Sequence, residues 1–115
     1  MIYFAPHAVG TDACAAYFEA LDGEACLGVC RLRLDGNRAD VFELTLTGGD
    51  AGIGEGLLRA AYHYAANKGA YWGVCSAKAD KAVTARLRFE SRNGVLENDI
   101  PTLLTGTCGG FDKTP

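Results

Sequence analysis

The chain has 115 residues, of which 49% are hydrophobic and 22% charged, and its formal net charge is −3. This length corresponds to one small domain with a core of its own, and the composition excludes a disordered chain. No apolar run is long enough for a membrane-spanning helix, and the charge lacks the strong basic excess of a nucleic-acid-binding protein. We therefore expect a single domain, residues 1–115, with neither nucleic acid nor membrane as a partner.

Five cysteines are present, and no two of them have Cys-x-x-Cys spacing. The two histidines, His7 and His63, lie at no metal-ligand spacing, so we expect no metal. We interpret Cys26, Cys30 and Cys75 as buried reduced thiols, because apolar residues surround them. The first residues also lack the charged start and apolar stretch of a secretory signal, so a cytoplasmic location is predicted.

Three strands joined by tight turns are predicted first. Residues 13–21 form a weak, alanine-rich strand that ends at Asp22-Gly23, and residues 24–34 alternate with a period of two. A second turn at Asp35-Gly36-Asn37 leads into a third strand over residues 38–47. Short turns between consecutive strands predict an antiparallel meander.

A glycine-rich segment and a change of period follow. Residues 48–56 contain five of the 15 glycines, and apolar residues over 53–65 recur with helical spacing. The helix is expected to end near Lys68-Gly69, since glycine supplies a left-handed cap. The apolar run 70–75 predicts a strand that is buried on both faces and parallel to the third strand.

The last third of the chain is predicted to be helical. Asp80 is placed as the cap of a helix that runs to about Asn93-Gly94 and carries several basic side chains. Asp99-Ile100-Pro101 then opens a short final helical element through Leu103-Leu104.

Residues 44–58 combine a strand, a glycine loop and the start of a helix. Glycine lets the backbone approach a ligand, and the first helical turn offers N–H groups without internal partners, so this arrangement suits a phosphate. A Walker loop would end in Gly-Lys-Ser/Thr, whereas this one ends in Gly54-Glu55-Gly56. The dinucleotide fingerprint fails as well, because Leu57 stands where its third glycine is needed and the preceding strands form a meander.

The order of elements over residues 15–95 resembles the GNAT superfamily of N-acetyltransferases. The loop of that family commonly reads Arg/Gln-x-x-Gly-x-Gly/Ala, and the frame here is Gly49-Asp50-Ala51-Gly52-Ile53-Gly54. Its last three residues match, whereas Gly49 stands where the family has arginine or glutamine. The resemblance implies a short or minimal member with an α+β, three-layer fold: a mixed, mainly antiparallel sheet with a V-shaped splay and helices on both faces.

The same resemblance implies a site for acetyl-CoA or another acyl-CoA. The pantetheine arm would follow the backbone of one strand, and the diphosphate would bind N–H groups at the helix start, where Asp50 and Glu55 oppose it electrostatically. Arg59, Lys78 and Arg86 are candidates for a further phosphate. The implied cofactor-binding residues are Leu44, Leu46, Ala51, Gly52, Ile53, Gly54, Glu55, Gly56 and Arg59.

For catalysis, the resemblance implies a carboxylate base on the central strands. Glu43 is the best candidate, and the alternative that it only pairs with Arg31, Arg33 or Arg38 at the sheet surface stays open. The tyrosine that the family uses as a general acid has no equivalent, because Glu90 stands at its position.

Three functional readings follow. The first is an acyl-CoA-dependent transfer of the acyl group to a primary amine of unknown identity. The second is a non-catalytic GNAT-like binding or oligomerisation module, and the third is an unrelated α+β domain whose glycines only form turns. Since a minimal chain leaves sheet edges exposed, we also expect a homodimer.

Overall fold

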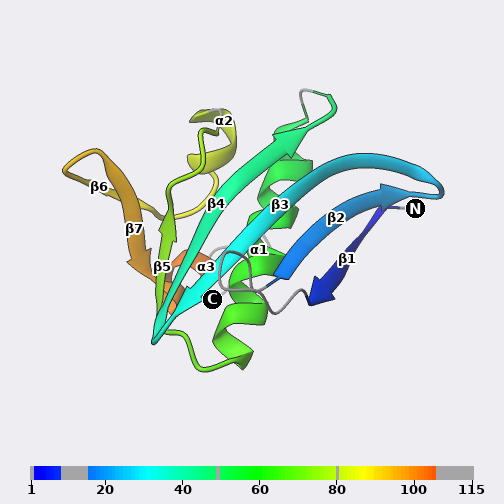
Figure 1. The fold of residues 1–115 in the computed structure, drawn as a ribbon. Helices are drawn as coiled ribbons and strands as arrows, with labels where there is room; N and C mark the ends of the chain where they lie inside the picture. Colours follow the sequence, from blue (N-terminus) through cyan, green and yellow to red (C-terminus); the bar gives the residue numbers. More distant parts are fainter. Residues whose placement is uncertain (1, 9–15, 49, 80, 106–115) are drawn as a thin grey trace, which may run out of the picture.

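The structure, a computed structural model, describes residues 2–8, 16–48, 50–79 and 81–105. A seven-stranded sheet with the order β1-β2-β3-β4-β5-β7-β6 forms its body (Figure 1). The strands are β1 (Ile2–Ala8), β2 (Ala16–Asp22), β3 (Ala25–Asp35), β4 (Arg38–Leu46), β5 (Trp72–Cys75), β6 (Glu90–Arg92) and β7 (Val95–Asp99). The helices are α1 (Ala51–Asn67), α2 (Lys81–Thr84) and α3 (Ile100–Leu104).

The predicted meander and parallel pair are both confirmed. Strands β2, β3 and β4 pair antiparallel in order, and Gly23 and Gly36 adopt a φ of +63° at the connecting turns, which glycine tolerates best. β5 then pairs parallel to β4, from Arg38 opposite Trp72 to Val41 opposite Cys75. The long helix between them also ends as predicted, with Gly69 at a φ of +96°.

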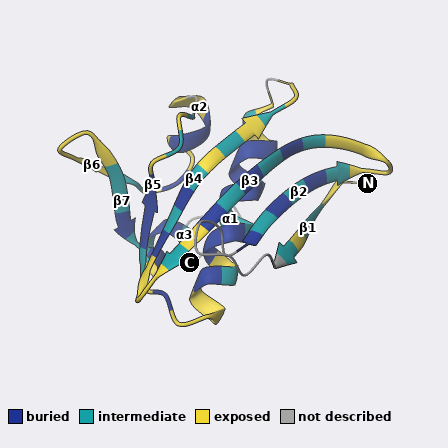
Figure 2. Cartoon of the chain, viewed as in Figure 1, coloured by how far each residue is buried: buried dark blue, intermediate teal, exposed yellow. Residues whose placement is uncertain are grey.

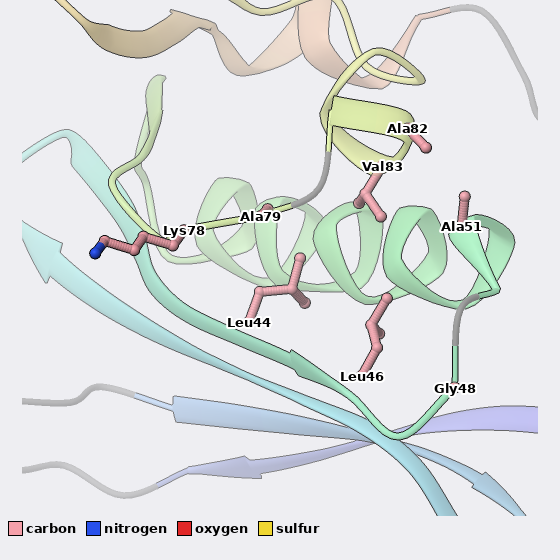
Figure 3. A pocket seen from close by; sticks show the side chains of 8 residues that line it. All are labelled: Leu44, Leu46, Gly48, Ala51, Lys78, Ala79, Ala82 and Val83. Atoms are coloured by element: carbon pink, nitrogen blue, oxygen red, sulfur yellow. The ribbon is translucent and has the colours of Figure 1, made fainter.

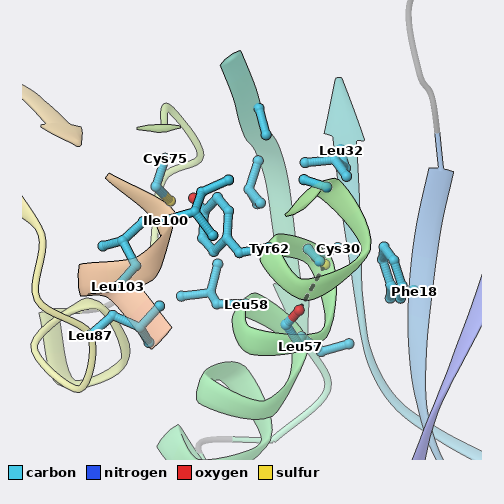
Figure 4. Packing of buried hydrophobic residues seen from close by; sticks show 14 of the residues in the cluster. Phe18, Cys30, Leu32, Leu57, Leu58, Tyr62, Cys75, Leu87, Ile100 and Leu103 are labelled. Atoms are coloured by element: carbon cyan, nitrogen blue, oxygen red, sulfur yellow. Dashed lines mark hydrogen bonds between the residues drawn. The ribbon is translucent and has the colours of Figure 1, made fainter. Parts of the chain in front are cut away.

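Helix α1 supplies the centre of the core. Its inner side buries Leu57, Leu58, Ala61, Tyr62 and Ala65 completely against β2, β3 and β4 (Figures 2 and 4). The other two helices both contact α1, so the three described helices cover one face of the sheet. The α+β class and the mixed, mainly antiparallel sheet are confirmed, but helices on both faces are not found in the described part of the chain.

The opposite face of β1–β4 is polar enough to meet water without a helical cover. Charged and aromatic side chains pair across neighbouring strands there. These pairs are His7 with Tyr17, Tyr17 with Arg31, Arg31 with Glu43, and Arg33 with both Asp40 and Phe42. This pairing explains why the expected second helical layer is not needed over these strands.

The long helix predicted after Asp80 is wrong. Helix α2 ends at Thr84, and β6 and β7 form an antiparallel hairpin further along. Its turn is Asn93-Gly94, with φ values of +54° and +81°, the left-handed pair typical of a two-residue hairpin loop. Asp80 itself lies outside the described residues. The short helix α3 is as predicted, since Asp99 caps it by accepting the Thr102 N–H at 2.9 Å.

Strand β1 is not among the predicted elements, and Pro6 stands within it. Proline lacks an N–H group and is tolerated only where no partner strand needs one. β1 pairs only with β2 among the described strands and forms one edge of the sheet, so Pro6 is accommodated.

The cysteine prediction holds in part. Cys30 and Cys75 are buried, but Cys26 is exposed. The register of β2 and β3 shifts after Ala20, so an extra residue breaks the alternation that would place Cys26 on the face of Cys30. Cys14 and Cys108 lie outside the described residues. Within those residues, no group of three His, Cys, Asp or Glu side chains could hold a metal ion, and no helix is long and apolar enough to cross a membrane.

Candidate functional site

A cavity opens where β4 and β5 part. The N–H groups of Ser76 and Ala77 both donate to the carbonyl of Val41, at 3.0 and 3.1 Å. Beyond Val41, β4 continues to Leu46, whereas β5 has ended and the segment that follows it diverges from β4. The cavity has a volume of about 200 Å³ (Figure 3). Its lining residues are Leu44, Leu46, Gly48, Ala51, Lys78, Ala79, Ala82 and Val83. The V-shaped splay predicted beside Leu44 is therefore present.

Leu44 and Leu46 face this cavity with both side chain and backbone. Figure 3 shows the two side chains pointing from β4 toward α1 and α2. The Thr47 N–H donates to Leu27 of β3 at 3.0 Å, and main-chain groups alternate in direction along a strand. The N–H and C=O groups of Leu44 and Leu46 thus turn away from β3, at a level where β5 has already ended.

The start of α1 is capped from within the chain. Asp50 accepts the Gly52 N–H on its carboxylate at 2.8 Å and the Ile53 N–H on its carbonyl at 3.1 Å. Two of the amide groups expected to bind a diphosphate therefore already have partners. Gly49, the position of the family's arginine or glutamine, lies outside the described residues.

Gly54 and Gly56 allow close packing of the protein against itself. A Cβ atom on Gly54 would lie 2.7 and 2.8 Å from the two methyl groups of Val83 in α2. A Cβ atom on Gly56 would overlap the ring of Phe4 in β1. The space that these two glycines leave beside the backbone is therefore filled by side chains of the protein itself, not left for a ligand.

Glu55 is a buried carboxylate at the centre of an ion cluster. Its side chain is 4% exposed and contacts Arg59 Nε at 2.9 Å and Arg86 Nη1 at 3.1 Å. Arg59 also donates to the Leu104 carbonyl at 3.2 Å, so the cluster joins α1, the segment after α2, and α3. Of the three predicted phosphate-binding cations, only Lys78 lines the cavity.

Glu43 lies on the opposite, helix-free face of the sheet. It stands across from Arg31 in β3, and its Oε1 is 3.3 Å from Arg31 Nε, with both side chains about half exposed. The guanidinium of Arg31 in turn lies over the ring of Tyr17. The structure thus places Glu43 in one of the surface pairs that the sequence left open and does not place it in the cavity lining.

Tyr62 is fully buried and structural. Its hydroxyl donates to the Val74 carbonyl at 2.6 Å, and burial raises its pKa well above the ordinary value. Residues that sequence reasoning missed are Gly48, Ala79, Ala82 and Val83, which line the cavity. Only Gly48 could have been identified from its neighbours in the sequence, because it belongs to the glycine-rich segment. The other three line the cavity because the chain after β5 folds back over it.

Comparison with known proteins shows a likeness in fold. No protein-family model and no curated protein matches this chain. Among solved structures, it is similar to the solution NMR structure of YhhK from E. coli, a candidate N-acetyltransferase, bound to coenzyme A. The TM-score is 0.61 at 20% identity, and the match covers 83% of this chain and 79% of that chain. The chain has the GNAT-like fold that the sequence predicted.

Proposed function

We propose that the chain binds acetyl-CoA or another acyl-CoA in the cavity between β4 and residues 76–79. One observation carries this proposal: β4 extends past β5 and turns the main-chain groups of Leu44 and Leu46 toward a cavity whose lining side chains, apart from Lys78, are apolar. A pantetheine arm contains amide groups that can pair with such a free strand, and its methylene groups would be buried among leucine and valine side chains. The coenzyme A bound to the E. coli protein of similar fold supports this choice of ligand.

In this proposal the predicted cofactor-binding residues have two roles. Leu44, Leu46 and Ala51 would touch the arm, because they line the cavity. The start of α1, with Gly52 and Ile53, would lie at its mouth. Gly54, Glu55, Gly56 and Arg59 would act indirectly, by fixing α1 against β1, α2 and α3.

Isothermal titration with acetyl-CoA tests this proposal. Ala82 lines the cavity and Ala85, three residues further along the chain, does not, so Ala82→Trp and Ala85→Trp form a matched pair. We expect wild type and Ala85→Trp to bind acetyl-CoA, and Ala82→Trp to bind at least tenfold more weakly because the indole fills the cavity. Absence of binding to folded wild type at millimolar ligand would refute the proposal.

We further propose that the bound acyl group is transferred to a primary amine. The amine nitrogen would form a bond to the thioester carbonyl carbon, the C–S bond would break, and the thiol would leave with a proton. Glu43 is the proposed base that takes the proton of the amine, which would approach from the helix-free face.

Glu43→Gln tests this role. We expect turnover to fall about 100-fold while acetyl-CoA affinity stays unchanged, since only proton transfer is lost. The matched control is Glu24→Gln, which alters an exposed carboxylate at the β2–β3 turn. Equal turnover in Glu43→Gln and wild type would remove Glu43 from the mechanism.

A second candidate function is a non-catalytic binding module. It is favoured by the pairing of Glu43 with Arg31 and by Glu90, which is exposed in β6 and paired with Arg92 at 2.7 Å. Thiol release can be measured with acetyl-CoA and a panel of polyamines and aminoglycosides. Transfer to any of these amines would exclude this candidate, whereas binding without transfer would support it.

A further inference from the structure

The charged side chains near the cavity do not match those that coenzyme A would need, because the negative one lies where the diphosphate would bind and the positive one lies elsewhere. Lys78 is the single charged residue among those that line the cavity. In Figure 3 its ammonium group lies at the end away from Gly48 and Ala51. At the helix start, where a diphosphate would lie, the Asp50 carboxylate accepts the Gly52 N–H, although Asp50 is not among the residues that line this cavity.

A second hollow lies beside Gly48 and the helix start. It measures about 140 Å³ and is lined by Ile2, Leu27, Gly48, Asp50 and Ile53, so it shares Gly48 with the first cavity. Its lining is apolar except for Asp50. Gly48 therefore lies between the two hollows, and the charged side chain that lines the second hollow beside it, Asp50, is negative.

The N–H groups at the start of α1 are also engaged. A diphosphate there would have to displace the Asp50 carboxylate from the Gly52 N–H, where it sits at 2.8 Å. It would gain little from nearby arginines, because Arg59 and Arg86 are both held by the buried Glu55. If the carboxylate stayed in place, it would repel the ligand's negative charges.

We infer that Asp50 selects the acyl donor, by admitting the neutral pantetheine arm and disfavouring a diphosphate at the start of α1. This inference rests on the proposed function, whose donor it narrows. The favoured ligand class is an acyl thioester of pantetheine in which no diphosphate follows the arm. The nucleotide half of acetyl-CoA then contributes little to binding.

Titration of one protein with two donors tests this inference. Acetyl-CoA and acetyl-pantetheine share the arm and differ in the nucleotide diphosphate. For wild type we expect dissociation constants within about threefold of each other. Asp50→Ser and Asp50→Asn keep a capping group and remove the charge, so they are expected to bind acetyl-CoA about five- to tenfold more tightly and acetyl-pantetheine unchanged.

Asp99→Ser is the matched control, because it makes the same exchange at the cap of α3, outside both hollows. It should leave both affinities unchanged. Two results would overturn the inference and leave the proposed function standing. One is that wild type binds acetyl-CoA more than tenfold better than acetyl-pantetheine, and the other is that both Asp50 variants bind acetyl-CoA with unchanged affinity. Failure of wild type and both variants to bind either donor would overturn the proposed function, and this inference with it.

Discussion

Gly54 lies where α1 packs against Val83 of α2. Its residue type is explained by the two Val83 methyl groups, which leave no room for a Cβ atom. Gly48, in the same glycine-rich segment, has no atom within 4 Å of the place that its Cβ would take. Glycines that look alike in the sequence are therefore required for different reasons, and only the packing partner distinguishes them.

Gly54→Ala is expected to lower the free energy of unfolding by about 1–3 kcal/mol, because the added methyl group overpacks the contact with Val83. Urea denaturation measures this change. Gly48→Ala is the control and should lie within about 0.5 kcal/mol of wild type. Equal stability of the two variants would show that α2 does not pack on Gly54.

The Cys75 thiol gives the protein a dependence on alkaline pH. Burial raises the pKa of Cys75 from 9.0 to about 11. Between these pH values the unfolded chain loses the thiol proton and the folded chain keeps it, so stability falls as pH rises. The loss amounts to at most about 2 kcal/mol by pH 11.

Cys75→Ala should therefore show a shallower decline in unfolding free energy from pH 9 to pH 11 than wild type does. Cys26→Ala alters an exposed cysteine and should retain the wild-type slope. Denaturant titrations at several pH values measure both. A wild-type slope in Cys75→Ala would mean that its thiol is accessible to water in the native state.

Among the elements, the β6–β7 hairpin depends on its two-residue turn. Gly94 adopts a φ of +81°, and an L side chain there is strained by about 1–2 kcal/mol. Gly94→Ala should thus increase amide hydrogen exchange in β6 and β7, with less effect on the β2–β3 pair. Ser91→Ala, in the same hairpin but outside the turn, is the control. Unchanged amide hydrogen exchange in Gly94→Ala would show that the hairpin does not depend on the left-handed conformation of Gly94.

Elements set by local pattern could be predicted from the sequence, and elements set by distant partners could not. The meander and α1 are predicted by the periodicity of their apolar residues and by the glycines at their turns. Residues 81–93 also have apolar spacing that suits a helix, but the free side of β5 is filled by β7, and β6 pairs with β7 in turn. Such pairing is a tertiary gain that local propensity does not report.

The same distinction applies to the site. Leu44, Leu46 and Ala51 could be predicted, because the strand and the start of the helix fix them locally. Val83 could not, because it reaches the cavity only through the close contact of α2 with Gly54. The capping of Gly52 by Asp50 follows a local rule and could have been expected from the Asp residue just before the helix.

At the scale of the whole molecule, the two sheet edges differ. β6 is three residues long and carries Glu90 and Arg92, features that discourage pairing with another chain. β1 is seven residues long and exposes Ile2 and Tyr3, which are 44% and 50% accessible. The predicted homodimer is therefore expected to form through β1.

Sedimentation of wild type should then give twice the chain mass of 12.1 kDa. Tyr3→Lys adds a charge to the β1 edge and should shift the protein to the monomer. Tyr71→Lys, which alters an exposed tyrosine elsewhere, should remain dimeric. Wild type that sediments at the monomer mass at 0.1 mM would refute the prediction.

The placement of all described helices on one face has a consequence for how this protein can change. Substitutions under α1 must respect a closed core, whereas a surface pair such as Arg33 with Asp40 contributes about 0–1 kcal/mol. The helix-free face can therefore acquire new side chains, and with them new molecules to recognise, while the cavity on the other side stays as it is. The sheet thus separates a tightly packed core from a surface on which side chains other than Glu43 can be exchanged at little cost in stability.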